Sequence, residues 1–98
     1  MKNQREVRRE ALLGIEKLLA RQLEVMRVPV PRHYWTVSID GSYNEVDLTC
    51  IKGSGGEITI QFSGEELDCL DHNAKFATFA KISALGSALL RDHQKSGK

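Results

Sequence analysis

Two cysteines and three histidines could ligate a soft metal ion or act as nucleophiles: Cys50, Cys69, His33, His72 and His93. Cys69 and His72 lie three residues apart, a spacing that suits two ligands of one zinc ion. A structural zinc site usually has a second Cys/His pair at similar spacing, and this sequence has none. We therefore predict buried thiols, solvent-exposed histidines, and neither a metal nor a cofactor.

A glycine-rich run at residues 53–56 is the segment whose composition best suits phosphate binding. Phosphate-binding loops present backbone N–H groups at the start of a helix, whereas this run connects two predicted strands. The sequence also contains no nucleophile elbow, P-loop or HExxH motif. We expect the run to be a hairpin loop, and we predict no catalytic residues and no enzymatic activity.

Charge is divided into three blocks along the chain. Residues 1–33 carry eight Lys/Arg and four Glu, a net charge of +4, and residues 74–98 carry five Lys/Arg and one Asp, again +4. Residues 34–73 carry one Lys and eight Asp/Glu, a net charge of −7. Such asymmetry bears on the partners of a protein rather than on its fold.

The acidic block contains three predicted strands. Apolar residues alternate with polar ones in the series Trp35/Val37/Ile39, Val46/Leu48/Cys50 and Ile58/Ile60/Phe62. Each alternation predicts one buried and one exposed face. The connectors at 41–44 and 53–56 are short and rich in turn residues, so we expect an antiparallel meander.

Helices are predicted on either side of the strands. Residues 3–27 have an apolar stripe at helical spacing, with Asn3 as the N-cap and prolines beyond the end. Ser63 and Glu66 form a capping box that begins a second helical region, which runs to about residue 91. An unbroken helix of that length, about 43 Å, would overhang a domain of this size, so we expect a break at residues 71–73.

These elements predict an α+β fold in the order α-β-β-β-α(α). Its core is a three-stranded antiparallel meander with helices packed on one face. The chain of 98 residues suits a single domain, which we place at residues 1–93, followed by a disordered C-terminal tail at 94–98.

The exposed face of the predicted sheet is strongly acidic. Its outward positions carry Asp40, Glu45, Asp47 and Glu57, and Tyr34 is placed at the rim. One-sided acidity suits docking onto a basic surface, although a charged face can also serve solubility alone. We predict these five residues as partner-binding residues.

The C-terminal helix is apolar or small nearly all round between residues 74 and 90. A helix of this kind is buried on more than one side, either within one subunit or against a second copy. We predict a homodimer whose interface contains Phe76, Ala77, Phe79, Ala80 and Ala84.

The sequence favours a small non-catalytic protein-binding module, an adaptor or an inhibitor, that docks its acidic sheet face onto a basic partner. Small inhibitors encoded by phage or mobile elements often have this form, short, single-domain and motif-free, which is an analogy of size and style. The alternative is nucleic-acid binding through the basic N- and C-terminal helices, although glutamates lie among the basic residues of the first helix. A helix needs about 20 apolar residues to span a bilayer, and no segment of this sequence approaches that length. We therefore expect a cytoplasmic protein without membrane contact.

Overall fold

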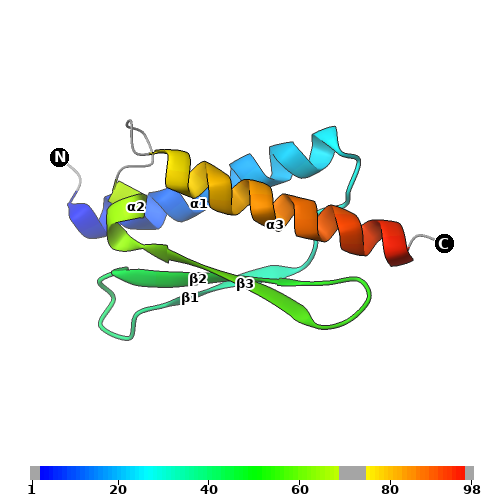
Figure 1. Cartoon of the computed structure of the whole chain (residues 1–98). Helices are drawn as coiled ribbons and strands as arrows, with labels where there is room; N and C mark the ends of the chain where they lie inside the picture. Colours follow the sequence, from blue (N-terminus) through cyan, green and yellow to red (C-terminus); the bar gives the residue numbers. More distant parts are fainter. Residues whose placement is uncertain (1–2, 69–74, 97–98) are drawn as a thin grey trace.

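Two long helices lie on one face of a three-stranded sheet (Figure 1). The computed structural model describes residues 3–68 and 75–96. The elements are α1 (Gln4–Val25), β1 (His33–Val37), β2 (Glu45–Ile51), β3 (Glu57–Ser63), α2 (Gly64–Asp68) and α3 (Lys75–Ser96). This order confirms the predicted α+β class.

The sheet is an antiparallel meander in the order β1-β2-β3. Trp35 pairs with Leu48, and Leu48 pairs in turn with Ile60. Alternate residues therefore point toward the helices, and Leu48 and Phe62 are buried there. The predicted strand order and the predicted inward residues of β2 are both confirmed.

The core lies between the sheet and the two long helices. α1 and α3 supply most of its aliphatic side chains: Ala11, Leu12, Ile15, Leu19, Leu23, Ile82, Leu85 and Leu89. The two helices approach closely where a Cβ at Gly86 would lie 2.4 Å from the side-chain nitrogen of Gln22. A small residue at this point lets α3 settle against α1.

Helix starts follow the predicted capping chemistry. The Asn3 side chain accepts a hydrogen bond from the backbone N–H of Glu6 at 2.8 Å. The backbone N–H of Ser63 donates to Oε1 of Glu66 at 2.9 Å, and the N–H of Glu66 donates to the Ser63 hydroxyl at 3.2 Å. The reciprocal pair is the capping box, and it begins α2.

The first strand is shorter than its alternation pattern predicts. β1 ends at Val37, Asp40 lies in the following turn, and Ile39 is fully exposed rather than buried. The Ser38 hydroxyl donates to the carbonyl of Glu45, and the turn contains Gly41 in the left-handed region. The backbone ladder therefore ends at Val37, where side-chain hydrogen bonds take its place, although the alternation in the sequence continues to Ile39.

The long C-terminal helical region consists of two helices. α2 ends at Asp68 and α3 begins at Lys75, while the expected break at residues 71–73 lies outside the described residues. α3 continues through Ser96, into the segment predicted as a disordered tail.

Candidate functional site

The face of the sheet opposite the helices is not covered by any element in residues 3–68 and 75–96 (Figure 1). We call it the open face. Strand alternation places on it the side chains of Tyr34, Thr36, Glu45, Asp47, Thr49, Ile51, Glu57, Thr59 and Gln61. The register brings Asp47 to the centre, between Thr36 and Gln61.

Three carboxylates of the open face lack a cation partner within the described part of the chain: Glu45, Asp47 and Glu57. Glu57 accepts a 3.4 Å hydrogen bond from the Tyr34 hydroxyl. Elsewhere, Asp68 and Glu66 bind basic side chains at 2.9 and 2.7 Å. The open face therefore presents uncompensated negative charge, which attracts a basic surface.

The structure brings together four of the five predicted partner-binding residues. Glu45, Asp47, Glu57 and Tyr34 share the open face, and Tyr34 is 47% exposed. Asp40 lies in the β1–β2 turn instead, because β1 ends before it. The hydroxyl and backbone N–H of Ser42 lower the pKa of the Asp40 carboxyl, so this residue contributes to the turn.

Four of the five predicted dimer residues lie on the outer side of α3. Ala77, Phe79, Ala80 and Ala84 are exposed, whereas the neighbouring positions Thr78, Ile82, Leu85 and Leu89 are buried against the core. The Phe76 side chain lies outside the described residues. One subunit thus buries one side of α3, and a dimer through the other side stays a prediction.

A buried arginine connects α1, α2 and the β1–β2 connection. Arg8 is 7% exposed, and its Nε and Nη2 atoms bind the two carboxylate oxygens of Asp68, each at 2.9 Å. Its Nη1 atom donates to the carbonyl of Ser42 and to the side chain of Asn44, at 3.1 and 2.7 Å. These bonds fix the end of the sheet that carries Glu45.

The burial of Arg8 was not predicted from the sequence, where it is one of the eight Lys/Arg of the basic N-terminal block. A signal was available, because Arg8 stands three, four and seven residues before Ala11, Leu12 and Ile15 on the buried stripe.

A second polar cluster ties α1 to β1. Oε2 of Glu16 lies 2.9 Å from Nε2 of His33 and accepts a 3.1 Å hydrogen bond from the Trp35 indole. Nδ1 of His33 lies 2.9 Å from the carbonyl oxygen of Pro31. These contacts hold the inner side of β1 against the helix layer and leave the open face free.

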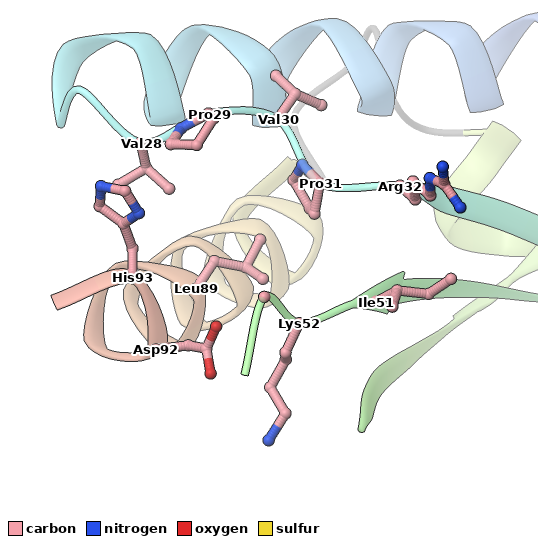
Figure 2. A pocket seen from close by; sticks show the side chains of 11 residues that line it. Val28, Pro29, Val30, Pro31, Arg32, Ile51, Lys52, Leu89, Asp92 and His93 are labelled. Atoms are coloured by element: carbon pink, nitrogen blue, oxygen red, sulfur yellow. The ribbon is translucent and has the colours of Figure 1, made fainter. Parts of the chain in front are cut away.

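A hollow of about 300 Å³ lies between the α1–β1 connection, the β2–β3 connection and the end of α3. Val28, Pro29 and Leu89 form an apolar wall, and Figure 2 shows the Lys52 side chain leading away from them. Asp92 at its rim accepts a hydrogen bond from the Ser54 hydroxyl. The lining also includes Arg32 and His93, and a mostly apolar wall with a few polar groups is usual in ligand-binding hollows.

The ligand candidates do not assemble into a metal centre in the described part of the chain, where no three His, Cys, Asp or Glu side chains are grouped for it. Cys69 and His72 lie outside that part. Cys50 is buried in the core, and burial raises the pKa of its thiol to about 11.

No helix in the described residues is long and apolar enough to cross a bilayer. Comparison of the chain with protein-family models, with curated proteins and with solved structures finds no match.

Proposed function

We propose that this protein is a small non-catalytic protein-binding module, an adaptor or an inhibitor, that acts in the cytoplasm. Its open face docks onto a basic surface of the partner. One observation carries the proposal: Glu45, Asp47 and Glu57 lie on an uncovered sheet face without a cation partner in the described chain, beside the exposed ring of Tyr34. Aromatic side chains next to charged groups are frequent anchors in protein interfaces.

The size of the open face sets the strength of this contact. Seven residues of β2 and three strands give a footprint of roughly 23 by 14 Å, or about 330 Å². A stable interface buries about 800 Å² on each partner. The open face of one subunit therefore supports a weak, salt-sensitive contact, and tight binding needs additional surface.

Nucleic-acid binding, the alternative, loses one of its residues in the structure. Arg8 is buried in its pair with Asp68, so it cannot reach a phosphate. The remaining basic residues of α1 stand among glutamates that repel a phosphate backbone. Tight binding to duplex nucleic acid would instead favour this alternative.

The test is affinity capture from cell lysate with immobilised protein, followed by mass spectrometry. We compare the wild-type chain with Asp47→Lys, and use Glu24→Lys as the matched control because it makes the same charge change on an exposed position of α1. We expect a protein with a basic surface to be retained by the wild type and by Glu24→Lys, and to be lost with Asp47→Lys.

Two results contradict the proposal. The first is equal retention of the same proteins by Asp47→Lys and the wild type. The second is a gel-shift complex with duplex DNA or RNA, at about 150 mM salt, that is tighter than the non-specific range of roughly 10⁻⁶ M. Such a complex favours the basic helices as the binding surface.

A further inference from the structure

The outer edge of β1 has backbone groups that pair with no residue of the described chain. The N–H of Ile51 donates to the carbonyl of Arg32 at 2.9 Å, which makes this pair a hydrogen-bonded one in the antiparallel ladder. Hydrogen-bonded and non-bonded pairs alternate along the strand, so Tyr34 and Thr36 bond to β2. The backbone groups of residues 33, 35 and 37 therefore point outward, where the described residues supply no partner strand.

On the opposite edge of the sheet, side chains close the C-terminal end of β3. Nζ of Lys81 donates to the carbonyl of Gln61 at 2.7 Å, and Oε1 of Glu66 accepts from the N–H of Ser63 at 2.9 Å. Lys81 and Glu66 also form an ion pair with each other. The Glu66–Lys81 pair thus blocks strand addition at the end of β3, one of the ways in which proteins protect sheet edges.

Within the part of the chain that the structure describes, no side chain protects the β1 edge in this way. Residues 33–39 contain no lysine, arginine or carboxylate, the residues that normally guard an exposed strand. Val37 is 40% exposed and Ile39 is fully exposed beside this edge. Pro31 lacks an N–H and ends the pairing-competent segment on the N-terminal side.

We propose that two copies of the chain pair through this edge, with their β1 strands antiparallel about a two-fold axis beside Trp35. The outward groups are symmetric about Trp35, so Val37 of each copy pairs with His33 of the other. No charged side chain of residues 33–39 opposes its own copy.

The helix layer also contributes an apolar side chain to the seam, the line along which the two β1 strands pair. Leu13 lies one helical turn before Glu16, the α1 residue that contacts β1, and is 59% exposed. In the pair, both α1 helices lie on the same side of the joined sheet, and their Leu13 side chains face the seam.

Pairing produces a continuous six-stranded sheet and doubles the open face to about 660 Å², near the size of a stable docking surface. The two Asp47 side chains are then three strand spacings apart across the sheet and two residues apart along it, roughly 16 Å in all. This exceeds the screening length of about 8 Å at physiological salt, so the acidic groups do not oppose pairing. The pairing itself does not depend on the proposed function, because it needs no other partner.

The outer side of α3 is the competing surface for a homodimer. Between residues 77 and 87 its exposed side chains are small except for Phe79, and a helix already satisfies its own backbone hydrogen bonds. The β1 edge instead has donors and acceptors that a second copy can pair, which is why we favour it.

Amide hydrogen exchange measured by NMR on the intact chain tests the pairing residue by residue. The amides of Tyr34 and Thr36 bond to β2 and serve as internal controls. We expect their exchange to be slow at all concentrations, whereas the amides of residues 33, 35 and 37 become protected as protein concentration rises. Sedimentation equilibrium over the same range should show a dimer with a micromolar dissociation constant, because a five-residue strand pair is small.

Variants separate the two surfaces. Val37→Lys places a charge at the edge in both copies and should weaken the dimer roughly tenfold or more. Val37→Pro removes the outward N–H and should do the same if the fold, followed by Trp35 fluorescence, is retained. Val25→Lys, an exposed position on α1, is the matched control and should leave the dimer unchanged.

Three results overturn the proposal. One is a monomer at several hundred micromolar. Another is a dimer in which the amides of residues 33, 35 and 37 exchange as fast as in the monomer. The last is a dimer that survives Val37→Lys and dissociates with Ala80→Arg, which assigns the interface to α3.

Discussion

Replacing Asp68 by asparagine should destabilise the fold strongly, because it removes the counter-charge of a buried guanidinium. Arg8 makes four hydrogen bonds, two of them to Asp68, and is 7% exposed. Breaking a fully buried ion pair costs about 3–5 kcal/mol. Since the Asp68 side chain is 28% exposed, we expect roughly 2–3 kcal/mol for Asp68→Asn.

Urea unfolding followed by Trp35 fluorescence measures this loss. With a slope of about 1–1.5 kcal/mol per molar urea for a domain of this size, the midpoint should fall by roughly 2 M. Asp47→Asn is the matched control, because Asp47 has no cation partner in the described chain, and should stay within about 0.5 kcal/mol of the wild type. An Asp68→Asn midpoint that matches this control would refute the anchoring role of Arg8.

The pH dependence of the stability difference between the wild type and Asp68→Asn gives a second check. Hydrogen bonds from Arg8 lower the pKa of the Asp68 carboxyl below its ordinary value of 3.8, despite the opposing effect of burial. When folding lowers the pKa of a carboxyl group, the resulting stabilisation is complete above the ordinary pKa of that group. It is lost as the pH falls through the pKa of the folded state. The gap between the wild type and Asp68→Asn should therefore be constant near neutral pH and should close below about pH 4.

Further predictions concern the buried thiol of Cys50 and two glycines at packing contacts. Burial raises the pKa of the Cys50 thiol to about 11, so at pH 8 its alkylation by iodoacetamide should be roughly a hundredfold slower in the folded chain than in urea. Peptide mass spectrometry measures both rates, and equal rates would show an accessible thiol. Gly64→Ala should cost about 1–3 kcal/mol, since its Cβ would lie 2.5 Å from Cζ of the immobilised Arg8. Gly86→Ala should lower the stability less than Gly64→Ala in the same urea assay, because its Cβ meets the movable end of the Gln22 side chain and alanine favours the helix by about 1 kcal/mol. A larger loss of stability for Gly86→Ala would contradict these packing contacts.

The fold could be predicted from the sequence where local chemistry and periodicity agree. The reciprocal Ser63 and Glu66 bonds need only residues three apart, and the β2 alternation shows directly which side chains face the helices. Asn3 is recognisable for the same reason, because an N-cap depends on its neighbours in sequence.

Prediction failed where long-range contacts override the local pattern. Arg8 looks like an exposed residue of a basic helix until Asp68, 60 residues away, supplies its partner. Ile39 continues the strand alternation, but the Ser38 side chain and the following turn end the ladder first. The open face could be predicted from the alternation of charged residues, whereas the unequal protection of the two sheet edges depends on Lys81, which only the fold places beside Gln61.

The most direct measurement of the docking role is the affinity of the captured partner for the double variant Asp47→Lys/Glu57→Lys, by calorimetry at two salt concentrations. Both positions are exposed or half-buried on the open face, so the fold should be retained within about 0.5 kcal/mol per substitution. We predict that wild-type affinity falls with added salt, that the double variant binds at least roughly tenfold more weakly, and that Glu24→Lys binds as the wild type does. Undiminished affinity of the folded double variant would contradict the open face as the docking surface.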